Sequence, residues 1–208
     1  MKSLSETYDQ RIKEIHHQYK NVISPFIMQL EVLDGLYPIE ILNEIRAVFG
    51  HLSKCYLSEG PDAIERNLDK ADGHIKRAIL DCYKYLCLAY NDKYKEFDNN
   101  YRNVDLSEID NGEFLPVLCK KRIEAINKLT DAKKNELQTS DVEVLYNGFE
   151  EAYNAYADVY NLINNSMVKI EYLKRKAKIR SIRPAISFWI GIFGFLVGLV
   201  GIILAVVG

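Results

Sequence analysis

The segment AISFWIGIFGFLVGLVGIILAVVG, residues 185–208, contains no charged side chain. As a helix, its 24 residues would extend roughly 36 Å, enough to cross a hydrocarbon core of about 30 Å. A helix buried in a protein core is the alternative, but such helices are usually charge-free over only about 10–14 residues. The segment therefore predicts a single C-terminal transmembrane helix.

A basic segment, residues 174–184, comes immediately before this predicted helix. Cytoplasmic flanks of membrane helices carry an excess of Lys and Arg, so residues 1–173 are predicted to face the cytoplasm. The N-terminus, MKSLSETYDQRIKEIHH, lacks the basic-then-apolar order of a signal peptide. We therefore expect a tail-anchored, single-pass protein of a bacterial inner membrane, with the basic segment at an anionic leaflet. The six basic residues are Lys174, Arg175, Lys176, Lys178, Arg180 and Arg183.

The charge balance of the remaining chain argues against binding to nucleic acid in general. The whole chain carries a net charge of −2, and residues 174–208 hold six basic and no acidic side chains, which leaves −8 on the first 173 residues. Such an acidic body is poorly suited to phosphate backbones, and no DNA partner is expected. The four cysteines, Cys55, Cys82, Cys87 and Cys119, form no CxxC pair and would stay reduced in the cytoplasm.

The first 173 residues read as an all-α bundle of about five helices, with no alternating strand pattern. A first helix is predicted over about 5–35, interrupted at Ser24-Pro25 because proline lacks a backbone donor. Ser140 is a plausible cap for the fifth helix. The acidic, turn-rich sequence DNNYRNVDLSEIDNGEFLP, residues 98–116, forms the longest connection. The other helices are predicted over 38–57, 63–97, 117–137 and from about 140 onward.

The glycines of the C-terminal segment share one face of the predicted helix. Steps of three and four residues from Ser187 reach the positions of a small-residue seam, namely Gly191, Gly194, Gly198, Gly201, Ala205 and Gly208. In lipid, helices attract each other mainly through close backbone contact across such small residues. We therefore predict a homo-oligomer held by this seam.

Glycines at two adjacent positions per turn suit a ring, in which each helix meets two neighbours. Such a ring can enclose a channel with an apolar wall, gated by wetting and packing. The same register continues backward through apolar positions, and two interpretations stay open: helix pairing between copies, or packing against the core of the same chain. These positions are Val142, Leu145, Phe149, Ala152, Tyr156, Val159, Ile163, Ser166, Ile170, Leu173 and Ala177.

The chain carries few motifs of catalysis. It has no phosphate-binding loop, no dinucleotide fingerprint, no HExxH and no Cys/His cluster at zinc spacing, so neither a cofactor nor a metal is expected. In EIRAVFGHL, however, Arg46 and His51 match the pattern R-x4-6-H. Histidine can act as general acid or base, and arginine can stabilise charge on a phosphate. Because five helical positions span about 140°, one chain alone presents this pair poorly.

Residues 38–97 resemble HEPN domains, helical bundles that often cut RNA as dimers. The resemblance rests on Arg46 and His51, followed by ADGHIKRAILDCYKYL on the next long helix. It implies a ribonuclease site in which these two residues are catalytic. HEPN nucleases usually have a polar residue where this chain has Ala47, so the pair could instead bind or brace an interface. Arg11 and His16 form a second match to the spacing.

A HEPN-like domain with a membrane segment resembles the membrane accessory proteins of RNA-targeting type VI CRISPR systems and other antiviral membrane effectors. This resemblance implies a role in antiviral defence, with RNA or a CRISPR effector complex as a further partner besides lipid and copies of the chain. The sequence thus predicts an oligomeric membrane effector that forms a pore. The alternatives are a tail-anchored HEPN ribonuclease and a membrane scaffold without activity of its own.

Overall fold

The computed structural model describes the backbone of residues 6–35, 37–58 and 60–207, and the side chains of these ranges except Thr7, 181–186 and 193–207. No β-strand occurs within these ranges, which confirms the all-α prediction. The elements are α1 (Glu6–Gln18), the π-helical turn η1 (Tyr19–Ile23), α2 (Ser24–Asp34), α3 (Ile39–Leu57), α4 (Pro61–Tyr101), the 3-10 turn η2 (Ile109–Gly112), α5 (Phe114–Gln138) and α6 (Val142–Val207).

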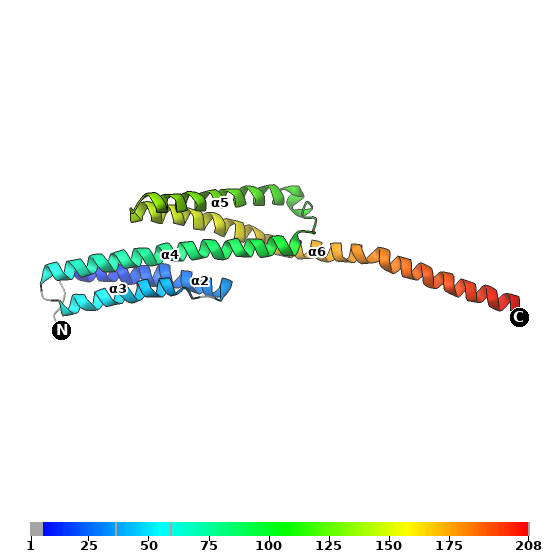
Figure 1. Ribbon diagram of the computed structural model, residues 1–208, viewed down its shortest axis with the longest axis horizontal. Coiled ribbons are helices and arrows are strands. Elements are labelled where there is room, and N and C mark those ends of the chain that lie inside the picture. Colours follow the sequence, from blue (N-terminus) through cyan, green and yellow to red (C-terminus); the bar gives the residue numbers. More distant parts are fainter. Residues whose placement is uncertain (1–5, 36, 59, 208) are drawn as a thin grey trace.

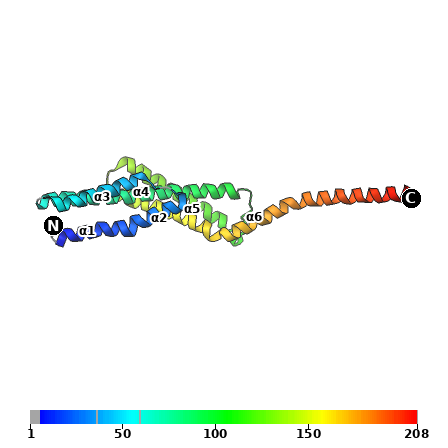
Figure 2. The same ribbon diagram turned by 90° about the horizontal axis from the view of Figure 1, so that it is seen from below.

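The long helix α4 lies at the centre of the bundle. Helix α3 runs back along one side of it, α6 packs on another side, and α5 packs on α6 (Figure 1). Helices α1 and α2 also lie against α4. Helix α6 then leaves the bundle and continues alone to the C-terminal end of the chain (Figures 1 and 2). With 66 residues, it is roughly 100 Å long.

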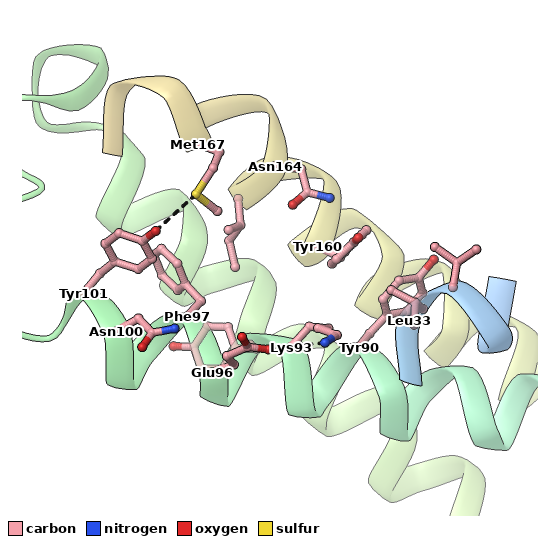
Figure 3. Close-up of a pocket in the computed structure, with 13 residues that line it drawn as sticks. Leu33, Tyr90, Lys93, Glu96, Phe97, Asn100, Tyr101, Tyr160, Asn164 and Met167 are labelled. Atoms are coloured by element: carbon pink, nitrogen blue, oxygen red, sulfur yellow. Dashed lines mark hydrogen bonds and ion pairs between the residues drawn. The ribbon is translucent and has the colours of Figure 1, made fainter. Parts of the chain in front are cut away.

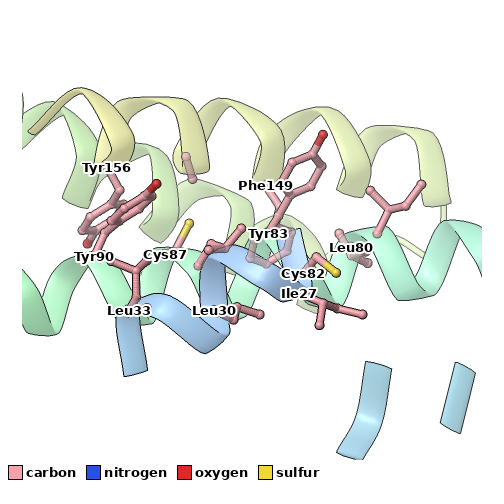
Figure 4. Close-up of a cluster of buried hydrophobic side chains, with 14 of the residues drawn as sticks. Ile27, Leu30, Leu33, Leu80, Cys82, Tyr83, Cys87, Tyr90, Phe149 and Tyr156 are labelled. Carbon is pink, nitrogen blue, oxygen red and sulfur yellow. The ribbon is translucent and has the colours of Figure 1, made fainter. Parts of the chain in front are cut away.

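The core runs through the whole bundle, and Figure 4 shows the part of it where α2, α4 and α6 meet. Leu30 from α2, Leu86 from α4 and Phe149 from α6 are fully or almost fully buried, and each such side chain contributes about 1.5–3 kcal/mol of apolar transfer free energy. Aromatic rings join the helices, with 4.9 Å between the ring centroids of Tyr90 and Tyr160. The buried apolar surface explains why these segments are helical together, since isolated helices are marginal in water.

The apolar register of α6 faces the core of its own chain. Positions from Phe149 to Leu173 that were predicted from the register are all buried, and they pack against α4 and α5. Val142, Leu145 and Ala177, at the two ends of the register, are partly exposed. Of the two interpretations, packing within the same chain is therefore correct for this part of α6. Its periodicity carries no evidence for pairing between copies.

The interruption predicted at Ser24-Pro25 is a widened turn rather than a break. The backbone of Ile23 and Ser24 stays helical, with φ −67° and −59°. The Ser24 N–H donates to the carbonyl of Tyr19, five residues earlier. This π-type turn places Pro25 in the first turn of α2. Proline is tolerated there because the first backbone N–H groups of a helix have no acceptor within the helix.

The other boundaries lie close to the predicted ones, with three differences. Helix α4 continues to Tyr101 instead of ending near residue 97, and α5 begins at Phe114 instead of 117. The cap of α6 is Asp141 rather than Ser140, because the Asp141 carboxylate accepts the Glu143 N–H at 3.0 Å. At the end of α2, Gly35 takes the left-handed conformation (φ 64°) that a helix C-terminus favours.

Candidate functional site

His51 lies on the shared face of the antiparallel helices α3 and α4. Its Nδ1 atom lies 3.0 Å from Oδ1 of Asn67. Its ring stacks on the ring of His74, with 5.3 Å between centroids and 19° between planes. Asn67 is fixed in turn, since its amide nitrogen donates to the carbonyl of Ala63 at 2.9 Å. The contacts therefore orient the His51 ring from two sides.

His74 continues this polar row toward Glu44 and Arg77. Its Nδ1 atom lies 2.7 Å from a carboxylate oxygen of Glu44 and 2.7 Å from Nη2 of Arg77. One nitrogen cannot both donate to the carboxylate and accept from the guanidinium, so the tautomer decides which bond forms. Arg77 Nε also donates to Glu44 at 3.1 Å. The row is a connected network along the α3–α4 face.

Arg46 does not join this network. Its side chain is exposed, and the described part of the chain offers it no hydrogen bond or ion pair. The structure thus brings His51 together with Asn67 and His74, and leaves Arg46 outside the network. Sequence reasoning missed His74 and Asn67, although the seven-residue spacing from Glu44 to His51 and from Asn67 to His74 puts each pair on one helix face.

Arg11, from the second match to the motif, stabilises the packing of α1 on α4. Its guanidinium pairs with Glu65 at 3.4 Å, Asp69 at 2.8 Å and Asp72 at 2.5 Å. The hydrogen bonds to Asp72 and Asp69 raise the pKa of Arg11. Three carboxylates of α4 therefore hold α1 in place through one arginine, while His16 is exposed and contacts the ring of Phe49.

A second polar site lies where α6 leaves the bundle. Residues 102–113, which we call the acidic loop, connect α4 to α5 and contact α6. Lys176 Nζ donates to both carboxylate oxygens of Glu108, at 2.8 and 2.9 Å. Lys169 Nζ lies 2.5 Å from Asp110 Oδ1. Two lysines of α6, seven residues and therefore two turns apart, thus face two carboxylates of the loop.

Tyr101, at the end of α4, adds a further contact to this site. Lys174 Nζ lies 4.4 Å from the centroid of the Tyr101 ring, a cation–π geometry. The Tyr101 hydroxyl donates to the carboxylate of Glu171. This bond, together with burial, raises the pKa of Tyr101 to about 12. The hydrogen bond to Glu108 likewise raises the pKa of Lys176.

Two buried side chains anchor the acidic loop in the core. Leu106 and Ile109 are 6% and 2% exposed. The carboxylate of Asp105 accepts the N–H and the hydroxyl of Ser107, at 3.0 and 2.6 Å, and these bonds lower the pKa of Asp105. Asp110 takes a left-handed conformation with φ 50°, which points its carboxylate at α6 at some cost in backbone strain. The loop therefore presents fixed carboxylates.

The structure describes the side chains of only some of the remaining residues of the basic segment and the seam. Arg175, Lys178 and Arg180 are exposed. Ser187 is exposed, and a Cβ atom built on Gly191 would meet no atom within 4 Å. The side chains of Arg183 and of the seam positions Gly194, Gly198, Gly201, Ala205 and Gly208 lie outside the described residues.

A groove of about 370 Å³ lies beyond the end of α2, between α4 and α6 (Figure 3). Five aromatic side chains line it, Tyr90, Phe97 and Tyr160 among them. Its charged side chains, Lys93 and Glu96, pair with each other at 3.3 Å. The groove therefore offers apolar contact but no set of polar groups aimed at a reacting atom.

Within the described ranges, no three His, Cys, Asp or Glu side chains are grouped so as to hold a metal ion. The described residues also contain no helix with the length and apolar composition needed to cross a membrane. Most of the predicted segment 185–208 lies outside the residues whose side chains are described. Comparison of the chain with protein-family models, with curated proteins and with solved structures gave no match.

Proposed function

We propose that the protein is a membrane-anchored homo-oligomer that permeabilises the bilayer through its C-terminal segment. The observation that carries the proposal is the continuity of α6. One helix contributes Phe149 and Ile170 to the bundle core and continues to Val207, through the uncharged segment. A continuous helix transmits a rotation or tilt of the bundle directly to the part in the bilayer.

The described beginning of the segment supports this proposal. Phe188, Trp189 and Ile190 are 65%, 68% and 67% exposed, which is unfavourable in water and favourable at a bilayer. A tryptophan is common at the membrane interface. The neighbouring seam positions Ser187 and Gly191 have open space beside them, as a face that receives a second helix requires.

The function in a cell follows from the resemblance to antiviral membrane effectors. In that setting the bundle receives a signal, such as RNA or a CRISPR effector complex, and the ring of C-terminal helices opens. The channel wall is apolar, so conduction depends on wetting rather than on charge selection.

The test uses the full chain reconstituted in vesicles that contain a self-quenched dye. The wild-type protein should stay in the membrane after alkaline carbonate extraction and should release dye. Gly198→Leu should stay in the membrane but lose dye release, because the larger side chain separates neighbouring helices. Leu196→Phe, an addition of bulk about 160° away on the helix, should keep release. If vesicles with the wild-type protein retain their dye under every condition in which the protein assembles, the proposal of a pore is wrong.

His51→Ala separates this proposal from a tail-anchored ribonuclease. A pore held by the seam keeps dye release without the imidazole, whereas a ribonuclease loses RNA cleavage. A ribonuclease would also survive replacement of the segment 185–208 by an unrelated anchor. A scaffold would show neither activity, and dye release or cleavage would exclude it.

A further inference from the structure

The acidic loop and α6 meet at the end of the bundle from which α6 continues toward the C-terminus (Figure 1). Lys169 and Lys176 lie on the same face of α6, two turns apart, and each contacts one carboxylate of the loop. The basic segment that we expect at the lipid surface therefore already has a partner within its own chain. This partner is acidic, as an anionic leaflet is.

Distance along α6 decides which lysine lipid can reach. Lys176 precedes Ala185 by nine residues, about 14 Å of helix. The headgroup layer covers about 5–7 Å of this distance, and the remainder, about 8 Å, equals the Debye length at physiological ionic strength. Lys169 is 16 residues from Ala185, about 24 Å, and is screened from the leaflet. Only the pair of Lys176 and Glu108 is thus within reach of competing headgroups.

The exposed fractions of the ion-pair side chains and of the residues that anchor the loop show which contact can break. The side chains of Lys176 and Glu108 are 51% and 55% exposed, so water and lipid can reach the ion pair, which is therefore weak. Leu106 and Ile109 are buried and hold the loop on the bundle. The ion pair can therefore break while the loop stays folded.

We propose that the acidic loop and anionic lipid headgroups compete for Lys176. On a neutral bilayer Lys176 binds Glu108, and the loop holds the last bundle turn of α6. On an anionic bilayer the negative surface potential of the leaflet draws Lys176 away from Glu108 instead. Glu108 then loses its partner and faces a surface of its own sign. This inference rests on the proposed membrane anchoring, and it makes the attachment of α6 to the bundle depend on lipid charge.

The experiment places the full chain in lipid nanodiscs of phosphatidylcholine alone or with about one third phosphatidylserine, and measures hydrogen exchange of the backbone amides of residues 102–113. The wild-type loop should exchange roughly two- to five-fold faster on the anionic discs, the factor expected when one exposed ion pair is lost. Glu108→Gln should exchange at the faster rate in both lipids. Lys176→Gln should do the same.

Glu113→Gln is the matched control. Glu113 lies in the same loop and is exposed, and the described residues include no ion-pair partner for it. This variant removes the same charge and should keep the wild-type response to lipid. The double variant Glu108→Lys with Lys176→Glu keeps the pair but moves its cation from α6 to the loop, so its loop should exchange as slowly as the wild-type loop on the neutral discs.

Two failures are distinguishable. If the chain does not incorporate into nanodiscs of either composition, the membrane anchoring is wrong. If the chain incorporates but the wild-type loop exchanges equally in both lipids, the competition is wrong while the anchoring stands. An equal loss of the lipid response in Glu113→Gln would also overturn the specific role of Glu108.

Discussion

Phe149 provides the sharpest test of the assignment of α6 to the core of its own chain. Its side chain is completely buried, and the ammonium of Lys84 lies 5.1 Å from its ring centroid. Truncation of a buried phenylalanine to alanine costs about 3–5 kcal/mol. A groove of about 320 Å³ borders this ring, so water can partly fill the space that truncation leaves. We therefore expect about 3 kcal/mol for Phe149→Ala.

The assay is thermal unfolding of the full chain in a mild detergent, followed by circular dichroism. For a chain of this size about 3 kcal/mol corresponds to a fall in Tm of roughly 6–12 °C. Phe149→Leu, which retains most of the apolar volume, should cost about 1 kcal/mol and folds even if the alanine variant does not. Val168→Ala, on the same helix but 84% exposed, should change stability by less than about 0.5 kcal/mol.

Protein concentration separates packing within the chain from packing between copies. If Phe149 packs within its own chain, the loss of stability is the same over a tenfold range of concentration. If it packs between copies, the loss depends on concentration by mass action. A concentration-dependent loss, or a fall in Tm no larger than that of Val168→Ala, would refute the assignment.

Three further predictions concern glycine, cysteine and aspartate. Gly50→Ala should stabilise α3 by about 0.5–1 kcal/mol in the same melt, because its Cβ meets no atom within 4 Å, whereas Gly35→Ala should destabilise because φ is 64° there. A gain in both variants would contradict the left-handed cap. At pH 8, Ellman's reagent should rapidly modify only the exposed Cys119, and Cys119→Ser should remove this rapid phase. The reason is that burial raises the pKa of Cys82 and Cys87 to about 12, which keeps these thiols protonated. Rapid modification of several thiols would contradict a closed core. Burial raises the pKa of Asp81, so the folded state prefers the protonated carboxyl and loses stability as pH rises through that pKa. Asp81→Asn should therefore stabilise the protein at pH 7 but not near pH 3. Equal effects at the two pH values would contradict this role of Asp81.

Much of the fold could be predicted from the sequence because helical periodicity is local. The apolar spacing in α6 identified most of its buried positions, and Pro25 marked a real irregularity. The partner of each face was not predictable. The register of α6 fits a neighbouring copy as well as α4 and α5, and only the tertiary arrangement decides between them.

The candidate sites could be predicted less completely, because they join residues far apart in the chain. The spacing of Arg46 and His51 suggested a pair, yet an ideal helix turns them apart, and the partner of His51 is His74 on α4. The basic segment was recognised from composition alone. Its contact with Glu108 was not, because a turn-rich sequence does not reveal which carboxylates a loop will fix in place.

Self-association through the C-terminal segment is the central claim, and sedimentation equilibrium of the full chain in a density-matched detergent tests it most directly. The wild-type protein should sediment as a multiple of the 24.0 kDa chain, and Gly198→Leu should sediment as one chain. A wild-type protein that sediments at 24.0 kDa at every concentration would contradict the account.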